Sequence, residues 1–308
     1  MTILKVRHLT TYRYRRPVAF GEHRLLMRPR DSFDQRLIES RLEITPRARE
    51  LRWIHDVFGN CVTLATFEGQ ASELVFESTI SLDHTPDNAP DFRMSERAKS
   101  YPFAYDPEEL PDLRPLIEPG HPDPGGTVAA WARRFVSRGR NAAATGHILM
   151  TMTCAIRESF VYDRRAARGT QPPALTLQLR RGTCRDFALL MIEAVRSLGF
   201  AARFVSGYLY VPERDGPTYE GGGSTHAWCQ VYLPGAGWVE FDPTNGIIGS
   251  RDLVRVAVTR DPAQAIPLSG TYYGSRDDDL GMEVSVEVRT EPQTASLLVP
   301  LVAVAPAR

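Results

Sequence analysis

The residue whose surroundings most favour covalent chemistry is Cys184, in the stretch RRGTCRDFALL. The pattern Thr183-x-x-Asp186 is that of a capping box, in which the threonine accepts from an early backbone N–H and the acidic side chain reaches back to the cap. It predicts a helix that begins at Cys184. Unpaired backbone donors and the positive end of the helix dipole favour a thiolate at that position, and Arg181 and Arg185 add positive charge.

The helix that follows also permits a purely structural role for this cysteine. Its apolar residues recur at helical spacing and cover most of its surface, so we expect it to be buried nearly all round. Free cysteine is among the most frequently buried residue types. The helix position alone therefore favours packing, and a catalytic role requires a base from elsewhere in the chain.

His226 is the histidine best placed to be that base. It begins the predicted strand HAWCQVYL directly after a glycine-rich loop, at an edge that a substrate could reach. The other six histidines lie in predicted strands, a proline-rich linker or a helix, and we expect them to be structural or surface residues. They are His8, His23, His55, His84, His121 and His147.

Asp242 is the carboxylate that could orient this histidine. The segment HAWCQVYLPGAGWVEFDPTNG indicates a hairpin in which Tyr232 lies opposite Trp238. In that register Asp242 and His226 are diagonal neighbours on one face, with backbones roughly 7–8 Å apart. A slip of one residue would move Asp242 to the other face, where the same parity places Cys229. An Asp-Pro pair at a strand end is also a common turn starter.

Together these three residues predict a nucleophile, a base and an orienting carboxylate. His226 would take the proton of Cys184, the thiolate would attack an acyl carbon, and the imidazolium would protonate the leaving amine. Backbone N–H groups at the helix start could stabilise the oxyanion, with Tyr162 as a candidate second donor. Trp228 and Arg185 are candidates for the substrate cleft.

The elements that must position these residues form two predicted domains. Residues 1–90 alternate between apolar and polar side chains, which predicts an antiparallel β-sandwich with one face exposed to solvent. Prolines then recur every few residues, which predicts a surface linker over 91–125.

The catalytic core is predicted over residues 126–308. A helix opens with Thr127 as its N-cap, a second covers about 145–160, and the helix beginning at Cys184 is the third. Antiparallel strands follow, and Val284, Val286 and Val288 mark one more strand near the end. Helices followed by antiparallel strands give an α+β fold.

Composition and charge exclude several classes of function. Basic and acidic residues number 37 each, so we expect neither a nucleic-acid partner nor a membrane partner. The N-terminus lacks the apolar run of a secretory signal, and we expect a cytoplasmic protein. The four cysteines form no CxxC pair and are read as free thiols, and no ligand set for a metal or a cofactor is predicted.

The three chemical segments resemble the transglutaminase-like superfamily of papain-type thiol enzymes. RGTCRDFALL, THAWCQVYL and WVEFDPTNG match the Cys, His and Asp motifs of that family in order. TTYRYRRPVAFGEHRLLMRPR resembles the N-terminal domain of bacterial transglutaminase-like proteins. The resemblance implies a papain/transglutaminase-like core in which Cys184, His226 and Asp242 are catalytic. Many members carry histidine where this chain has Leu189, which is outside the three motifs.

The function expected from these features is acyl transfer from a peptide or protein amide through a thioester on Cys184. Water could resolve the thioester, as in a peptidase or amidase, or an amine could, as in a transglutaminase. Hydrolysis is favoured because water needs no second binding site. The alternative is a catalytically inactive peptide-binding protein on the same fold, and zinc binding ranks last because a fourth ligand is missing. The oligomeric state is not predicted.

Overall fold

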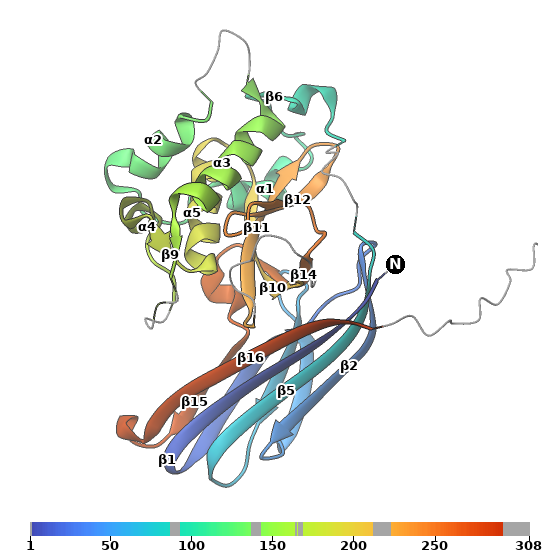
Figure 1. Cartoon of the computed structure of the whole chain (residues 1–308), viewed down its shortest axis with the longest axis vertical. Coiled ribbons are helices and arrows are strands. Elements are labelled where there is room, and N and C mark those ends of the chain that lie inside the picture. The colour runs from blue at the N-terminus through green and yellow to red at the C-terminus, as the bar shows by residue number, and fades with distance from the viewer. Residues whose placement is uncertain are drawn as a thin grey trace, which may run out of the picture.

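Figure 1 shows a computed structural model of the chain in two parts, a curled antiparallel sheet and a core of helices packed on a second antiparallel sheet. The structure describes residues 2–86, 93–136, 143–163, 165, 169–211 and 223–291. The predicted α+β fold is confirmed. The glycine-rich loop predicted before His226 lies mostly outside the described residues. No helix within these ranges is long and apolar enough to cross a membrane.

The N-terminal sheet has seven strands and is organised by one very long strand, β1. The strands are β1 (Thr2–Arg28), β2 (Gln35–Thr45), β3 (Glu50–His55), β4 (Cys61–Thr66), β5 (Ala71–His84), β15 (Leu268–Tyr273) and β16 (Asp279–Glu291). The first half of β1 pairs with β5 and β16, and its second half pairs with β4 and β15. All of these pairings are antiparallel.

The prediction of a β-sandwich is wrong, because the strands form one sheet that curls into a half-barrel (Figure 1). β1 continues through both halves and joins them, whereas a sandwich has two separate sheets packed face to face. The alternation itself was read correctly: Leu4 and Val6 are buried, and Lys5 and Arg7 are exposed. A period of two identifies the buried face of a strand and carries no information on how many sheets the strands form.

The assignment of every residue after 126 to the core is also wrong. β15 and β16 leave the core and pair with β1, so the chain returns to the sheet with which it began. Alternation at Val284, Val286 and Val288 correctly predicted a strand, which is β16. The pairing partner of a strand is a long-range choice that alternation alone does not encode.

The segment predicted as a linker over 91–125 packs against the core where it is described. Its elements are η1 (Glu96–Ala98), β6 (Ser100–Tyr101), α1 (Leu110–Ile117) and η2 (Pro124–Gly126). The hydroxyl of Tyr105 donates to the carbonyl of Tyr232 at 3.0 Å and accepts from the amide of Ala201 at 2.8 Å. These bonds fix the segment to the core sheet.

The core places helices against a five-stranded sheet in the order β13-β12-β11-β10-β14. The helices are α2 (Thr127–Arg133), α3 (Thr145–Ser159), α4 (Pro173–Leu179), α5 (Cys184–Ser197) and η3 (Pro262–Ala265). The strands are β10 (Ala202–Leu209), β11 (His226–Leu233), β12 (Gly237–Asp242), β13 (Ile247–Ile248) and β14 (Leu253–Thr259). Short strands β7 (Ala143–Ala144), β8 (Val161–Tyr162) and β9 (Arg181–Gly182) and the 3-10 turn η4 (Arg276–Asp278) complete the described elements. α5 is central, and its side chains share one apolar cluster with β10, β11 and β12.

The helices predicted near 127 and over 145–160 are both present, but Thr127 is not an N-cap. It is the first residue of α2, and the carboxylate of Asp123 accepts from the amides of Val128 and Ala129, each at 3.0 Å. Asp123 stands four residues before Thr127, beyond the position at which a cap is normally sought.

Polar and apolar contacts fix the two parts of the molecule to each other. Leu4 and Val6 of the sheet share a buried cluster with Tyr208 of the core. The side chain of Asn60 donates to the carbonyl of Val258 at 2.8 Å and accepts from its amide at 2.9 Å. The side-chain amide of Asn60 therefore joins the N-terminal part to the backbone of β14, the outer strand of the core sheet.

Candidate active site

α5 places Cys184 at its first position, as the capping box predicts. The Thr183 side chain accepts from the amide of Asp186, and the Asp186 carboxylate accepts from the amide of Thr183 at 2.8 Å. The side chain of Cys184 is 6% exposed, at the edge of the apolar cluster beneath α5. The thiol thus lies where the unpaired N–H groups of the helix converge.

Asp186 does more than cap this helix. Its fully buried carboxylate also accepts from the guanidinium of Arg165, at 3.0 Å from Nε and 2.9 Å from Nη2, and from the amide of Gln171 at 2.7 Å. The Asp186 carboxylate therefore fixes the loop segments that contain Arg165 and Gln171 to the turn just before Cys184. The sequence identified Asp186 as a cap, and nothing in its spacing identified Arg165 or Gln171.

The β11–β12 hairpin has the register predicted from its alternation. Tyr232 pairs with Trp238, and Cys229 pairs with Phe241. This register brings together the two ends of the hairpin, so that His226 Nε2 and Asp242 Oδ2 lie 2.7 Å apart, with both side chains fully buried.

Asp242 is held by the turn that follows β12. Its Oδ1 accepts from the amide of Thr244 at 2.9 Å, and its Oδ2 accepts from the side-chain amide of Asn245 at 2.9 Å. Asn245 also lies 3.4 Å from His226 Nε2. The DPTNG turn thus orients the carboxylate, and Asn245 is a site residue that the sequence reasoning did not single out, although it stands three residues after Asp242.

The electrostatics of the site favour a protonated imidazole. Burial alone would lower the pKa of His226, but the charge of Asp242, their hydrogen bond and the thiol of Cys184 raise it to about 10. Burial acts on Asp242 in the opposite sense, and the charge and hydrogen bond of His226 hold the pKa of its carboxyl below its ordinary value.

The second imidazole nitrogen is the one available to the nucleophile. Nδ1 of His226 is buried and has no hydrogen-bond partner within the described residues. Nε2 is occupied by Asp242, and the Cys184 thiol is among the groups that raise the pKa of the same ring. Nδ1 is therefore the nitrogen left for the thiol.

Tyr162, the candidate oxyanion donor, lies beside the start of α5. β8 and β9 pair in parallel with Tyr162 opposite Gly182, which is two residues before Cys184. The amide of Asp163 donates to the carbonyl of Gly182 at 2.9 Å and fixes this pairing. Its role as an oxyanion donor stays a prediction.

Trp228 does not line a cleft, contrary to the prediction. Its side chain is fully buried, its indole N–H donates to Glu240, and its ring stacks against His226 with centroids 6.0 Å apart. The backbone of Gly207 passes so close that a Cβ there would lie 2.7 Å from the Trp228 ring. Trp228 therefore packs against the imidazole and keeps water from that side of it.

Arg185, the other residue predicted for the substrate cleft, is partly buried and hydrogen-bonded within the fold, and its role in a cleft stays a prediction. Its guanidinium donates to the carbonyl of Pro262 at 2.5 Å and to that of Ala265 at 3.4 Å, and it lies 4.8 Å from the Phe204 ring. Burial lowers its pKa. Arg185 thus anchors α5 to η3. The side chain of a charged residue next to a predicted site can point into the site or into the surrounding fold, and its position in the sequence does not decide between the two.

The remaining thiols differ from Cys184 in their surroundings. All four cysteines are free, as predicted. Cys229 is fully buried, its thiol donates to the carbonyl of Phe241 at 3.4 Å, and burial raises its pKa well above the ordinary value. Cys61 and Cys154 are partly exposed. In the part of the chain that the structure describes, no cluster of His, Cys, Asp and Glu side chains could hold a metal ion.

A cysteine at a helix start that faces a histidine held by an aspartate defines the papain-like class of thiol sites. Comparison of the sequence with family models is consistent with that class. Residues 129–243 match the model of the transglutaminase-like superfamily, and residues 4–83 match the model of the bacterial transglutaminase-like N-terminal region. The chain therefore contains a transglutaminase-like core over residues 129–243, preceded by a bacterial transglutaminase-like N-terminal region over residues 4–83. The family of the core supports a thiol-dependent enzyme.

Relatives and a solved structure extend this similarity over nearly the whole chain. An uncharacterized protein of Mycobacterium leprae is 29% identical over 287 residues, which cover 92% of this chain and 98% of the relative. An uncharacterized protein of Mycobacterium tuberculosis is 28% identical over 297 residues, 92% of this chain and 91% of the relative. The crystal structure of a candidate cysteine protease from Cytophaga hutchinsonii superposes with a TM-score of 0.68 at 20% identity, covering 96% of this chain and 92% of that one. This last match shows that the two chains share a fold.

Proposed function

We propose that the chain is a thiol-dependent amidase or peptidase that forms a thioester on Cys184. His226 acts as the acid and base, and Asp242 orients and charges the imidazole. The substrate class is a peptide or protein amide. The observation that carries the proposal is the buried His226–Asp242 pair, 2.7 Å apart, whose free ring nitrogen is left for the thiol at the start of α5.

The first half-reaction breaks the amide bond. Cys184 Sγ attacks the carbonyl carbon as its proton resides on His226, and the oxyanion that forms is stabilised by backbone N–H groups at the start of α5. Collapse of this intermediate breaks the C–N bond. The imidazolium of His226 gives its proton to the departing amine, which leaves a neutral imidazole and a thioester.

The second half-reaction releases the acyl group. Neutral His226 removes a proton from water, the resulting hydroxide attacks the thioester carbon, and the C–S bond breaks to return the thiol–imidazole pair. An amine in place of water would give a new amide by the same steps, so hydrolysis and transfer differ only in the acceptor. Water needs no second binding site, which favours hydrolysis.

Trapping of the acyl-enzyme tests this proposal directly. The chain is incubated with a mixed peptide library, quenched with acid, and digested for mass spectrometry, with Cys184→Ala and Cys229→Ala compared in parallel. We expect an acyl adduct on Cys184 in the wild type and in the Cys229→Ala variant, and none in the Cys184→Ala variant.

Adding hydroxylamine before the quench distinguishes a thioester from other adducts. Hydroxylamine should remove the adduct and release an acyl hydroxamate. Turnover of an amide substrate that is unchanged in the Cys184→Ala variant would reject the mechanism. Absence of both turnover and adduct in the wild type would also reject it, and would leave peptide binding without catalysis as the better account of the site.

A further inference from the structure

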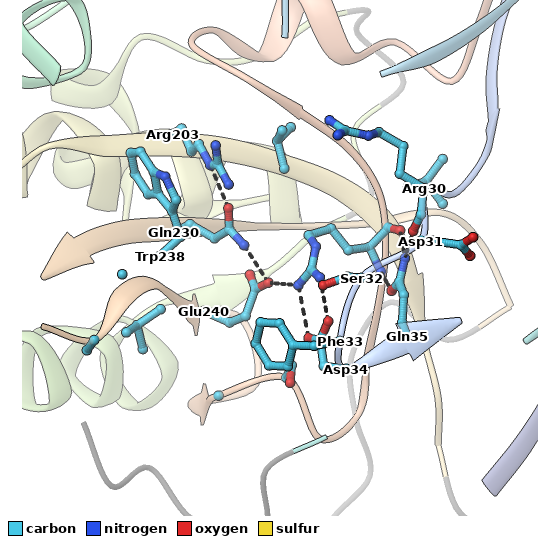
Figure 2. A pocket seen from close by; sticks show the side chains of 18 of the residues that line it. Arg30, Asp31, Ser32, Phe33, Asp34, Gln35, Arg203, Gln230, Trp238 and Glu240 are labelled. Carbon is cyan, nitrogen blue, oxygen red and sulfur yellow. Dashed lines mark hydrogen bonds and ion pairs between the residues drawn. The ribbon is translucent and has the colours of Figure 1, made fainter. Parts of the chain in front are cut away.

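A cavity lies between the two parts of the molecule, away from the candidate active site. Its volume is about 960 Å³, and none of Cys184, His226 and Asp242 lines it. Its walls come from the turn before β2, from β10 and the β11–β12 hairpin, and from β14 (Figure 2). Such a cavity is large enough for a small organic molecule.

Arg203 presents an unneutralised charge to this cavity. Its Nε donates to the side chain of Gln230 at 2.6 Å, and its guanidinium lies 4.0 Å from the ring centroid of Trp238. No carboxylate among the described residues forms an ion pair with it, and no described acceptor takes its terminal N–H groups. Burial lowers the pKa of Arg203 to about 10, which is a cost that a bound anion would relieve.

The carboxylates of the cavity are gathered around a different arginine. Arg255 pairs with Asp34 at 2.8 Å and with Glu240 at 2.6 Å. Glu240 accepts in addition from the side-chain amide of Gln230 at 2.6 Å. Figure 2 shows this chain of contacts, which runs from Arg203 through Gln230 to Glu240 and then, through the guanidinium of Arg255, to Asp34.

The same contacts hold Arg203 in one orientation before any ligand arrives. Because Glu240 fixes the Gln230 amide group, the oxygen of Gln230 must face Arg203, and Trp238 supports the guanidinium from one side. A guanidinium fixed in this way loses little side-chain entropy when it binds an oxyanion in a bidentate manner.

Two further arginines of the lining stand on the exposed rim. Arg30 and Arg93 are exposed, and the exposed acid that also lines the cavity, Asp31, accepts from the amide of Leu37 at 2.6 Å. The other two acids of the lining are paired with Arg255. Arg203, Arg30 and Arg93 therefore face a single remaining carboxylate, that of Asp31. The cavity therefore combines a fixed inner cation with a positive rim.

We propose that this cavity binds a small anion with at least two carboxylate or phosphate groups. Arg203 holds one acidic group beside the Trp238 ring, and Arg30 and Arg93 meet a second group at the rim. The binding site is separate from the thiol site and does not depend on the reaction proposed for Cys184.

Isothermal titration calorimetry with two probes, citrate and pyrophosphate, tests the proposal. The full chain carries Cys184→Ala, so that any failure of the proposed chemistry has no influence on binding. Arg203→Gln removes the inner cation, and Arg49→Gln serves as the matched control, because Arg49 is exposed and pairs with Glu68 on the N-terminal sheet. Glycerol is the neutral control.

We expect saturable binding of at least one probe, weakened tenfold or more by Arg203→Gln, which corresponds to about 1.4 kcal/mol, and unchanged by Arg49→Gln. Binding of citrate alone or of pyrophosphate alone supports the site and assigns its acidic group. Absence of saturable binding by both probes overturns the proposal, and so does equal affinity in the Arg203→Gln and Arg49→Gln variants.

A fluorescence measurement guards against loss of the fold in the Arg203→Gln variant. Because the Arg203 guanidinium lies on Trp238, an anion beside it should change the tryptophan emission. The change should be absent in Trp238→Phe. An emission change of equal size in Trp238→Phe would place the anion elsewhere and reject the proposed position.

Discussion

Replacement of Asp242 by Asn isolates the electrostatic contribution of the carboxylate to the candidate site. The substitution keeps the size of the side chain and removes its charge. The pKa of His226, which rises from 6.5 to about 10 in the fold, corresponds to about 5 kcal/mol of preference for the protonated ring. Burial opposes protonation, and the charge of Asp242 is the largest of the causes that raise the pKa. Without it, the pKa should fall to near or below 6.5.

The consequence for catalysis follows from the same balance. A neutral imidazole no longer stabilises a thiolate at Cys184, and an asparagine in place of the carboxylate can also select the wrong tautomer of the ring. We expect amide turnover to fall on the order of 10²–10⁴-fold. The rate at which iodoacetamide alkylates Cys184 at neutral pH should fall as well, and should recover as the pH is raised.

The assay is the pH dependence of Cys184 alkylation, combined with an NMR titration of His226. Asp261→Asn is a matched control, because Asp261 Oδ2 lies 2.8 Å from His121 Nε2 in a partly exposed pair. That variant should keep the wild-type profile. An Asp242→Asn variant with the wild-type alkylation rate and an unchanged His226 titration would refute the electrostatic role of the carboxylate.

Three further predictions concern the scaffold of the site. Asp186→Asn leaves the partly buried Arg165 without its carboxylate partner and should lower the free energy of unfolding by about 3 kcal/mol. Urea denaturation measures this change, and a loss under about 1 kcal/mol would show that the carboxylate does not hold the loops around Cys184 in place. Gly207→Ala places a Cβ 2.1 Å from the carbonyl oxygen of Val254 and 2.7 Å from the Trp228 ring and should destabilise the fold by about 1–3 kcal/mol, and a melting temperature equal to that of the wild type would show that both contacts relax freely. Because the folded pKa of His226 is raised to about 10 from 6.5, its stabilising contribution is fully present below pH 6.5 and is lost as the pH rises through about 10. Urea midpoints between pH 7 and pH 11 check this, and a flat profile would argue against a charged imidazole.

The thiol end and the hairpin end of the site could be predicted because local rules govern both. The capping box that begins α5 is encoded within four residues, Thr183 to Asp186, and the structure has it as predicted. The hairpin register depends on the parity of two adjacent strands and on a short turn. The hairpin register alone was sufficient to predict the approach of His226 and Asp242, whose side chains lie 2.7 Å apart.

The parts that could not be predicted depend on contacts between distant segments. β16 is recognisable as a strand from its valines, but its place beside β1 requires a choice among all the free strand edges of the molecule. Trp228 illustrates the same limit within the site, because burial behind His226 depends on how closely Gly207 approaches it. The network around Asp186 adds Arg165, which lies in a loop and has no periodic pattern.

The central claim is that Cys184 is an activated thiol, and competitive alkylation tests it most directly. Cys61 and Cys154 are more exposed than Cys184, which is 6% exposed, so access alone predicts that they react first. Brief treatment with a limiting amount of iodoacetamide at pH 7, followed by peptide mapping, measures the order of reaction. Activation by His226 predicts that Cys184 is modified first in the wild type and loses that lead in a His226→Ala variant. Modification of Cys61 and Cys154 before Cys184 in the wild type would contradict the account.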